Sequence, residues 1–574
     1  MTTEYEQATN QPIHQLGARK YLILGAIVTS HIALLAACST SEGGGEAMSA
    51  DGSVERMATI NISEPEQPAE MVVAGEAEAS AIDVTGSRAK YSYQDNAIAV
   101  HSVQTATDPG RERYDGKEVS AVKLTGIEPV STFSVDVDTG AYTNTRRFLN
   151  QGQLPPQAAV RTEEMINYFR YDYPRPENRN TPFSVTTDVA RSPWNEGTYL
   201  MRIGLRGYDI DRDDRPPANL VFLMDVSGSM AAEDKLPLVK TALSGLAGEL
   251  GPQDKVSIVV YAGAAGLVLQ PTNDVRQIRR ALQELDAGGS TAGGAGIKLA
   301  YNIAEDNFIK GGVNRVILAT DGDFNVGVSS RDALVEMIEK NRDRGITLTT
   351  LGFGQGNYNE AMMEQIANKG NGNYAYIDNA LEAKKVLGDE MSSTLFTIAK
   401  DVKIQVEFNP AVIGQYRLVG YENRALREED FNNDTVDAGD IGAGHQVTAI
   451  YEVVPTGKSG WIPARRYEDR FPASASKTMA EAAHVKLRYK LPDGKRSKLL
   501  DRVVTYEQLR RAKAPRGDFA FAASVAAFGQ ILRGDNLMQE FDFDDVGELA
   551  GRQNSYWRQE FLQLNALAAG MKGG

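Results

Sequence analysis

The sequence contains very few of the residues that form disulfides or bind zinc. Its 574 residues include a single cysteine, Cys38, so an internal disulfide is excluded. There are five histidines, and the three outside the N-terminal segment, His101, His445 and His484, lie far apart along the chain. None belongs to a zinc-binding spacing such as His-Glu-x-x-His. We therefore expect neither a disulfide scaffold nor a histidine-based zinc site.

Positive charge is also scarce. The 61 Lys and Arg residues are outnumbered by 76 Asp and Glu residues, which gives a formal net charge of −15. A nucleic-acid surface requires basic residues interleaved with aromatic ones, and no such run is present. The composition therefore argues against a nucleic-acid partner.

Signatures of enzyme active sites are equally few. Asp138-Thr139-Gly140 matches the aspartic-protease signature, but those enzymes need two carboxylates that share a proton, and the chain has no second copy. No Gly-x-Ser-x-Gly turn marks a serine nucleophile. The sequence therefore favours a protein that is not an enzyme.

Long apolar runs are absent except near the N-terminus. Arg19 and Lys20 precede a mostly apolar run, Tyr21 to Ala37, which is short for a membrane span and suits a signal-peptide core. The run ends in Leu35-Ala36-Ala37-Cys38, which resembles the bacterial lipobox. The resemblance implies that residues 1–37 are a signal peptide and that Cys38 becomes a lipidated N-terminus carrying acyl chains such as palmitate.

This leader implies a location in the cell envelope. Ser39 follows the cysteine, and the absence of Asp at that place predicts a lipoprotein of the outer membrane that faces the periplasm. An uncleaved membrane anchor is the alternative interpretation, and both interpretations place the body of the protein outside the cytoplasm.

The segment after Cys38 has the composition of a disordered tether. Residues 39–107 contain 11 acidic and 3 basic residues and are rich in Ser, Gly and Ala. Such a segment cannot bury enough apolar surface to offset the entropy lost on ordering. We therefore interpret residues 38–118 as a lipidated cysteine followed by a tether.

The rest of the chain is too long for one compact core and divides by pattern into three parts. Residues 119–215 combine expected helices and strands and predict a small α+β domain. Residues 216–392 alternate short apolar strands with amphipathic helices. Residues 393–574 predict a β-rich domain with terminal helices, since Val402, Ile404 and Val406 alternate with polar residues as in a half-buried strand. The terminal helices are expected at Phe519–Leu532 and Ser555–Leu567.

The central part predicts an α/β fold with a mostly parallel sheet and helices on both faces, because its strands are almost continuously apolar. The expected strands are Leu220–Met224, Val256–Tyr261, a short one near Leu267–Leu269, Arg315–Ala319, Leu348–Phe353 and Tyr374–Ile377. The expected helices are Lys235–Glu249, Val275–Leu285, Gly294–Asp306, Arg331–Arg344, Asn359–Asn368 and Leu381–Ile398.

Oxygen-bearing side chains follow two of these strands and precede one helix. Asp225-Val226-Ser227-Gly228-Ser229 comes after the first strand, and Thr320-Asp321-Gly322 comes after the fourth. Gly288-Gly289-Ser290-Thr291 opens the helix expected near Gly294. Ligands of open α/β sheets bind beyond the carboxyl ends of the strands, so these groups are expected to converge. Hard oxygen donors of this kind suit Mg²⁺ or Mn²⁺ in an octahedral arrangement.

With these motifs, residues 217–390 resemble the von Willebrand factor A (VWA) family and its metal-ion-dependent adhesion site. The resemblance implies a Rossmann-like fold in which hydroxyl oxygens of Ser227, Ser229 and Thr291 bind the metal, with Ser290 as the rival of Thr291. Asp225 and Asp321 would bind directly or through water. The sixth position would be left for an Asp or Glu of a partner protein.

The flanking segments resemble one bacterial family of VWA lipoproteins. Phe133 to Thr139 with Arg146 to Leu149 resembles the small domain that precedes the VWA domain in that family. Tyr421 to Arg424 and Asp437 to His445 resemble its C-terminal domain, whose function is not assigned.

These observations predict a lipid-anchored envelope protein that uses a metal-bearing VWA domain to bind a partner protein in adhesion or scaffolding. Two alternatives stay open. In the first, the metal only stabilises a structural envelope protein. In the second, the metal acts as a Lewis acid in a hydrolase, although no general base accompanies it.

Overall fold

A computed structural model describes residues 112–290, 293–322, 331–463 and 480–572. The expected signal peptide, Cys38 and nearly all of the acidic segment lie outside the described residues, as does Thr291. Within the described ranges, no helix is both long and apolar enough to cross a bilayer.

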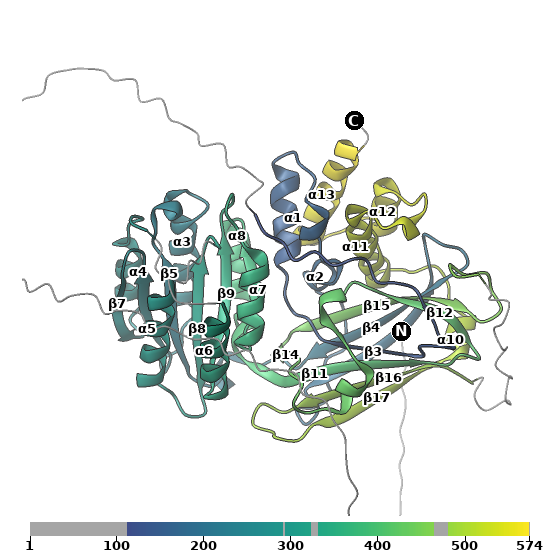
Figure 1. Cartoon of the computed structure of the whole chain (residues 1–574), viewed down its shortest axis with the longest axis horizontal. Coiled ribbons are helices and arrows are strands. Elements are labelled where there is room, and N and C mark those ends of the chain that lie inside the picture. Colours follow the sequence, from purple (N-terminus) through teal and green to yellow (C-terminus); the bar gives the residue numbers. More distant parts are fainter. Residues whose placement is uncertain (1–111, 291–292, 323–330, 464–479, 573–574) are drawn as a thin grey trace, which may run out of the picture. The chain divides into compact units, whose positions relative to one another are not determined.

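The central sheet has six strands in the order β10-β9-β8-β5-β6-β7 (Figure 1). Neighbouring strands are parallel except for β7, which pairs antiparallel with β6. This arrangement confirms the predicted mostly parallel sheet. The strands are β5 (Ala218–Asp225), β6 (Lys255–Tyr261), β7 (Ala265–Thr272), β8 (Val313–Thr320), β9 (Ile346–Phe353) and β10 (Tyr374–Ile377).

Helices cover both faces of this sheet because every residue of β5 is buried and successive side chains point to opposite faces. Leu220, Phe222 and Met224 share a core with residues of α3 and α4. Val221 and Leu223 share a second core with residues of α5, α6 and α7. The helices are α3 (Leu236–Ala247), α4 (Val275–Gln283), α5 (Gly293–Asp306), α6 (Arg331–Asp343) and α7 (Glu360–Lys369).

The last helix of this domain differs from the prediction of one helix over Leu381–Ile398. It consists of α8 (Ala380–Lys384), a π-helical turn (Lys385–Asp389) and α9 (Met391–Leu395). Strand β11 (Thr397–Phe408) begins directly afterwards, and Thr397 already pairs with Gly442 of β14 (Gly439–Gly442). Pairing with a distant strand therefore ends the helix earlier than the local pattern predicts.

Two antiparallel sheets are built jointly by the segments before and after the central α/β domain. The first has the order β1-β12-β15-β4-β3 and the second β13-β2-β11-β16-β17. The strands from before the domain are β1 (Lys123–Leu124), β2 (Val130–Ser134), β3 (Phe183–Arg191) and β4 (Tyr199–Gly207). Those from after it are β12 (Ile413–Val419), β13 (Ala425–Leu426), β15 (Gln446–Pro455), β16 (Glu481–Lys490) and β17 (Lys498–Thr505).

This sharing differs from the expected separate domains at 119–215 and 393–574. Strand β4 lies between β3 and β15, and β2 lies between β13 and β11. The N-terminal segment supplies only a few strands, and strands of the C-terminal segment complete both sheets. The predicted fold classes, α+β for the N-terminal flank and β-rich for the C-terminal flank, are confirmed. The two flanks nevertheless form their sheets together.

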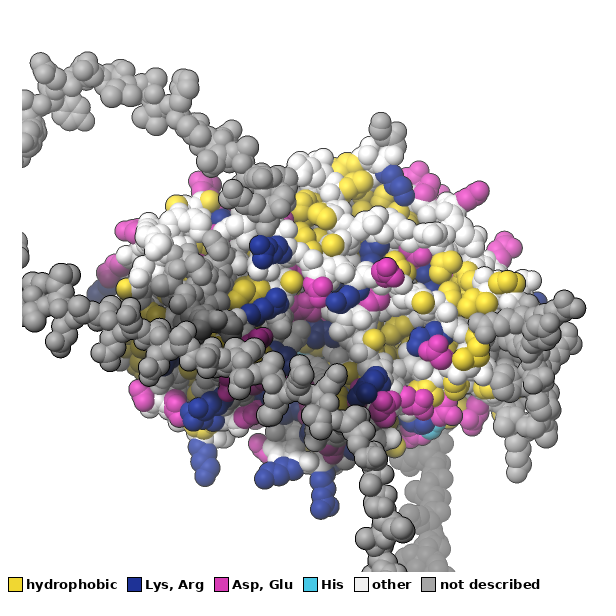
Figure 2. Space-filling model, viewed as in Figure 1, with side chains coloured by type: hydrophobic (Ala, Val, Ile, Leu, Met, Phe, Trp, Pro, Cys, Tyr) yellow, Lys and Arg dark blue, Asp and Glu magenta, His cyan; other side chains and the backbone are white. Residues whose placement is uncertain are grey.

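A helical layer accompanies these sheets, and it also draws on both segments. Phe169, Phe521 and Phe561 pack edge to face at its centre. All but one residue of α11 are buried, so other parts of the chain pack around this helix on all sides. The helices of this layer are α1 (Gly140–Asn150), α2 (Thr162–Asn167), α11 (Asp518–Arg533), α12 (Phe543–Ala550) and α13 (Tyr556–Lys572), which confirms both predicted terminal helices. The short helix α10 (Tyr506–Arg510) instead packs against β3, β16 and β17. On the face shown in Figure 2, acidic and basic side chains are interspersed among small apolar areas.

Candidate metal centre

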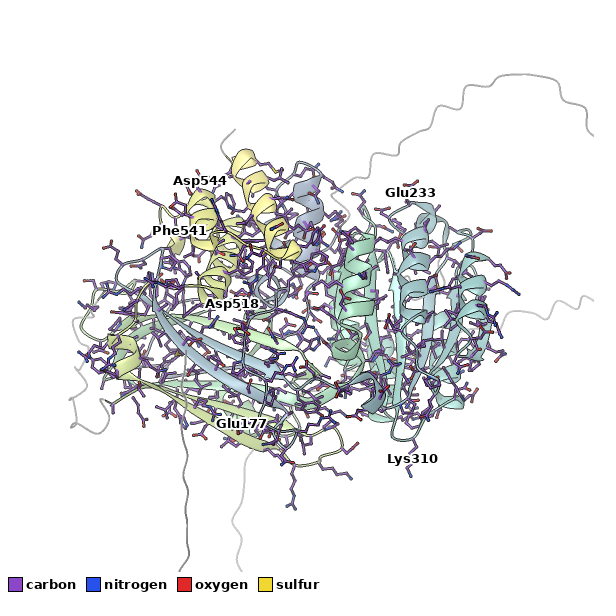
Figure 3. All side chains as sticks on the ribbon, turned by 180° about the vertical axis from the view of Figure 1, so that it is seen from behind. Glu177, Glu233, Lys310, Asp518, Phe541 and Asp544 are labelled. Atoms are coloured by element: carbon purple, nitrogen blue, oxygen red, sulfur yellow. The ribbon has the colours of Figure 1, made fainter. Side chains whose placement is uncertain are left out.

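The candidate site lies at the carboxyl end of the central sheet, where β5 and β8 finish side by side. Met224 pairs with Ala319 in parallel register, so Asp225 at the end of β5 and Asp321 just after β8 lie at the same edge. Figure 3 labels Glu233 near this end of the sheet and Lys310 near the opposite end. The predicted convergence of these two aspartates is therefore present.

The loop from Asp225 to Ser229 is held by backbone hydrogen bonds to the neighbouring glycine loop. The amide of Gly228 donates to the carbonyl of Gly289 at 3.0 Å, and the amide of Gly288 donates to the carbonyl of Val226 at 2.8 Å. Gly289 has a φ of +84°, a conformation that glycine adopts without strain. The two loops named by the sequence analysis thus form one unit.

The two serine hydroxyls of the motif lie next to each other. The Oγ atoms of Ser227 and Ser229 are 3.1 Å apart. Adjacent ligands of an octahedral Mg²⁺ ion, bound at about 2.1 Å, are separated by about 3.0 Å. Ser227 is buried whereas Ser229 is exposed, so the pair joins the interior to the surface. This spacing fits two neighbouring positions of one metal ion.

Asp225 is buried behind these hydroxyls and both of its oxygens accept hydrogen bonds. Its Oδ1 accepts from the amide of Ser227 at 2.9 Å. Its Oδ2 accepts from the hydroxyls of Thr320 at 3.0 Å and Tyr261 at 3.3 Å. Burial raises the pKa of Asp225, the hydrogen bonds from Ser227 oppose that shift, and the negative charge of Asp321 adds to it. A cation near Asp225 would offset both burial and repulsion.

Lys235 is a site residue that the sequence analysis did not identify. Its Nζ lies 2.8 Å from Oδ2 of Asp321, and both side chains are buried. Gly354, with a φ of +69°, leaves room for the aliphatic part of Lys235, because a Cβ there would lie 2.4 Å from two of its carbons. The sequence did contain a hint of this role. Lys235 is the first residue of the helix expected over Lys235–Glu249, which begins at the same edge of the sheet as the predicted metal-binding motif.

The described donors fit a small divalent cation. Two hydroxyl oxygens stand at ligand spacing, and two buried carboxylates lie behind them, all of them hard oxygen donors. Thr291, the third predicted hydroxyl, lies outside the described residues. In the part of the chain that the structure describes, no three His, Cys, Asp or Glu side chains surround a common metal position.

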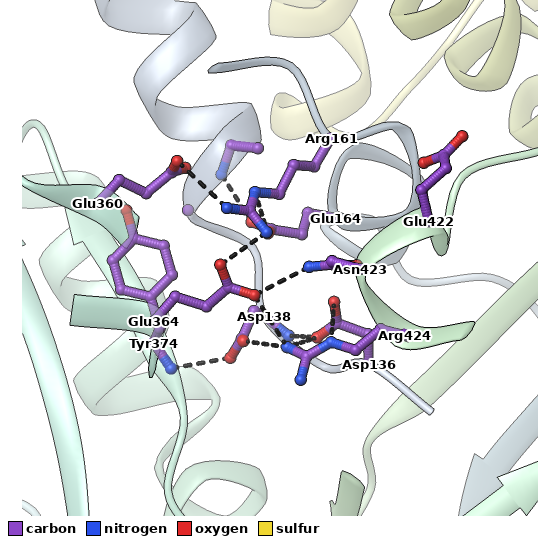
Figure 4. A network of polar contacts seen from close by, with 12 residues as sticks. Asp136, Asp138, Arg161, Glu164, Glu360, Glu364, Tyr374, Glu422, Asn423 and Arg424 are labelled. Atoms are coloured by element: carbon purple, nitrogen blue, oxygen red, sulfur yellow. Dashed lines mark hydrogen bonds and ion pairs between the residues drawn. The ribbon is translucent and has the colours of Figure 1, made fainter. Parts of the chain in front are cut away.

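A second polar cluster, also missed by the sequence analysis, joins the VWA domain to the flanking segments (Figure 4). Arg424 lies between Asp136, at 3.1 Å, and Asp138, at 2.8 Å. Asp138 also accepts a hydrogen bond from the amide of Tyr374 on β10 at 2.8 Å. Asp138, the residue of the protease-like signature, therefore has a structural role in this contact.

The same network continues through Arg161 at the start of α2. Its guanidinium lies 2.6 Å from Glu364 and 3.4 Å from Glu360, both on α7 of the VWA domain. Burial raises the pKa of Glu360 to about 7, while Arg161 acts in the opposite direction. The Oε1 atom of Glu360 has no hydrogen-bond partner among the described residues. This contact therefore holds more carboxylates than its arginines neutralise.

Arg146 of α1 makes a third contact across the segments. It binds Asp378 and Glu382 of the VWA domain and, at 2.8 Å, Glu560 of α13. The guanidinium is 1% exposed, so these ion pairs are shielded from solvent. One arginine thus ties together an N-terminal helix, the end of the VWA sheet and the C-terminal helix.

Comparisons with known families agree with this architecture. The model of the von Willebrand factor type A domain matches residues 219–389, and a model described as von Willebrand factor matches residues 108–202. A model of the C-terminal part of the uncharacterized protein YfbK matches residues 393–571. The three matches together run through nearly all of the described chain.

Individual relatives are similar over different lengths. The chain is 44% identical over 476 residues to the uncharacterized protein YfbK of Escherichia coli (strain K12), covering 81% of this chain and 82% of that protein. It is 33% identical over 189 residues to the uncharacterized protein sll0103 of Synechocystis, covering 32% and 43% respectively. A solved structure, the von Willebrand factor type A from Catenulispora acidiphila, is 15% identical with a TM-score of 0.38, covering 71% of this chain and 89% of that one. The chain therefore belongs to the YfbK family of bacterial VWA proteins.

Proposed function

We propose that this chain binds a partner protein through a divalent metal ion, Mg²⁺ or Mn²⁺, held at the end of its VWA sheet. Asp225, Ser227, Ser229 and Asp321 would hold the ion together with Thr291. The observation that carries the proposal is the 3.1 Å spacing of the two serine hydroxyls in front of buried carboxylates. The ion, once bound, supplies an electrophilic position that an Asp or Glu of the partner completes.

The residues around Ser229 support access by a partner. Gly228, Gly263, Gly288 and Gly289 are all exposed and have no side chains that would cover the hydroxyl of Ser229. Neutral hydroxyl donors also leave more of the cation's charge unbalanced than carboxylate donors would. An incoming carboxylate would therefore gain a strong interaction at a position that the described residues leave exposed.

The arrangement of the carboxylates favours binding over catalysis. A general base must be free to accept a proton from a bound nucleophile. Asp225 instead accepts hydrogen bonds at both oxygens, and Asp321 pairs with Lys235. We therefore place this chain among adhesion or scaffold proteins and not among metal-dependent hydrolases.

The proposal includes a location. A lipidated Cys38 at the end of an acidic segment would anchor the folded part to the envelope, with the outer membrane favoured by Ser39. Labelling with a palmitate analogue tests this part directly. Incorporation in the wild-type chain that disappears in Cys38→Ala supports lipidation, whereas equal labelling of both chains contradicts it.

Metal binding is tested by titrating the full chain with Mn²⁺ and following the free ion by electron paramagnetic resonance. We expect about one tight site per chain, weakened roughly tenfold or more in Ser229→Ala, since one of the few metal ligands is lost. Ser244→Ala, in α3 and away from the site, is the matched control. Unchanged Mn²⁺ affinity in Ser229→Ala would refute the proposed ligand set.

Partner binding needs a second measurement. The wild-type chain and Ser229→Ala are used to capture proteins from solubilised envelopes, with Mg²⁺ and with a chelator. A protein captured only by the Mg²⁺-loaded wild type, and lost when its own acidic residue is replaced, supports the adhesion role. If metal raises thermal stability but capture is identical in every arm, the ion has a structural role only.

A further inference from the structure

A second candidate binding site lies far along the chain from the metal centre, between β3, β4 and the loop that joins α10 to α11. It is a shallow pocket of about 480 Å³. Ligand pockets in proteins commonly have volumes of about 300–1,000 Å³. Figure 3 labels Asp518, which begins α11 next to this loop.

The charged side chains that line the pocket are mainly cations. Arg202, Arg511, Lys513 and Arg516 line it, and Asp188 is the only acidic residue among its lining residues. Four positive charges and one negative charge give a local excess of three positive charges, in a chain whose formal net charge is −15. This contrast with the rest of the chain indicates an anionic ligand.

Two of the four cations are not neutralised by neighbouring side chains. Among the described residues, Lys513 and Arg516 form no ion pair, and Arg511 pairs only with Glu507 on the exposed surface of α10. Asp518, the nearest acidic residue in sequence, is bound to Arg558 at 2.8 Å and does not line the pocket. Lys513 and Arg516 are therefore available to a ligand.

Arg202 forms the buried side of the pocket and has unused hydrogen-bonding capacity. It is 8% exposed, and its Nη2 lies 2.5 Å from Asp188. Its Nε and Nη1 atoms are buried and have no hydrogen-bond partner in the described structure. The guanidinium lies 4.7 Å from the ring centre of Phe519 and 5.2 Å from that of Tyr173, which fixes its plane.

The loop that carries the other cations is anchored to the sheet. The amide of Arg191 at the end of β3 donates to the carbonyl of Lys513 at 2.9 Å, and Arg191 Nε donates to Ala512 at 3.3 Å. The backbone amides of Lys513, Ala514 and Arg516 donate no hydrogen bond to another described residue. Cationic side chains and free amides are therefore presented on a fixed loop, as in phosphate-binding sites.

We propose that this pocket binds a phosphate group, carried by a phospholipid headgroup or by a small soluble phosphate. Several convergent cations favour a dianionic phosphate over a monoanionic carboxylate, and arginine matches the geometry of phosphate oxygens. The site shares no residue with the metal centre, so its test is independent of the proposed adhesion role.

The experiment uses the full chain and isothermal titration calorimetry with two probes, inorganic phosphate and dihexanoyl phosphatidic acid. The test variant is Lys513→Gln/Arg516→Gln, in which both exposed cations of the pocket are neutralised. The matched control is Arg496→Gln/Lys498→Gln, which removes the same charge from exposed positions outside the pocket. All four side chains are exposed, so the fold is expected to be retained, which circular dichroism checks.

We expect saturable binding to the wild type, weakened by about tenfold or more in the test variant and by less than about twofold in the control. Tighter binding of phosphatidic acid than of inorganic phosphate identifies a lipid headgroup as the source, and the reverse identifies a soluble phosphate. The absence of saturable binding for both probes overturns the proposal. Equal weakening in the test and control variants also overturns it, because general charge would then explain the binding.

Discussion

At the scale of single residues, the candidate metal centre contains a cation of its own. Lys235 lies 2.8 Å from Asp321 in a buried position, so one of the two backing carboxylates is already balanced by charge. The motif around Asp225 was recognisable in the sequence because its residues are adjacent. The pairing of Lys235 with Asp321 was not, since it joins residues that only the packing of α3 and β8 brings together.

Replacing Lys235 with Met should destabilise the metal-free chain by about 3 kcal/mol or more, because Asp321 keeps a buried charge without its ammonium partner. Mg²⁺ should then restore part of the loss, since a metal ion also neutralises Asp321. Thermal unfolding with and without Mg²⁺ measures both effects. A smaller rise in melting temperature with Mg²⁺ for Lys235→Met than for the wild type would contradict this account.

Ser229→Ala should behave differently from Lys235→Met. Its hydroxyl is exposed, so the free energy of unfolding without metal should change by less than about 0.5 kcal/mol. The stabilisation by added Mg²⁺ should be largely lost, because a ligand is missing. Urea unfolding in chelator and in Mg²⁺ separates the two quantities, with Ser244→Ala as control. A large loss of stability in chelator would mean that Ser229 has a structural role.

At the scale of helices and strands, close packing positions the site. Helix α5 contacts β6 at Gly296, where an added Cβ would lie 2.8 Å from Cβ of Tyr261 and 3.0 Å from its ring. Tyr261 in turn holds Asp225 through its hydroxyl. The apolar patterns in the sequence predict both α5 and β6. The distance between them, however, depends on Gly296, and glycine has a low helix propensity.

Gly296→Ala should therefore destabilise the chain by about 1–3 kcal/mol, because overpacking against Tyr261 exceeds the gain in helix propensity. Gly245→Ala in α3 is the matched control. A Cβ there has no neighbour within 4 Å, so the same change should stabilise by up to about 1 kcal/mol. Chemical denaturation of both variants gives the comparison. Equal effects in the two helices would show that packing at Gly296 is not close.

The break in the last VWA helix marks where local pattern fails as a guide. Residues 381–395 have helical character, yet a π-helical turn replaces part of the regular helix and β11 starts at Thr397. Tertiary contacts explain this, since Glu382 binds Arg146 and Thr397 pairs with Gly442. The parallel sheet was predictable because its strands are apolar throughout, whereas such long-range pairings leave no local trace.

At the scale of the whole molecule, the VWA domain is attached to its flanks through buried charge. The contact around Arg161 and Arg424 contains more carboxylates than arginines, and burial raises the pKa of Glu163 and of Glu360 to about 7. In the unfolded chain these carboxyls have an ordinary pKa of about 4.3. The folded chain therefore binds protons that the unfolded chain has already released.

Stability should consequently fall as the pH rises from about 4.5 to 7, because the raised pKa favours the protonated, folded form below that range. We expect the melting temperature of the wild type to decrease over this interval by more than that of Glu360→Gln, whose amide does not titrate. Glu336→Gln, an exposed position on α6, should keep the wild-type slope. Identical slopes for Glu360→Gln and the wild type would exclude Glu360 as a source of the pH dependence.

The two shared sheets have a consequence for how the chain is made. Synthesis proceeds from the N-terminus, so β2, β3 and β4 emerge before the VWA domain, whereas their partners β11 and β15 emerge after it. The VWA sheet contains only strands that are consecutive in sequence and is complete as soon as β10 has been made. Folding during synthesis would therefore run from the middle outward. The early strands would keep open edges until the last third of the chain has been made, so a chaperone that holds unfolded chains would bind this protein during its synthesis.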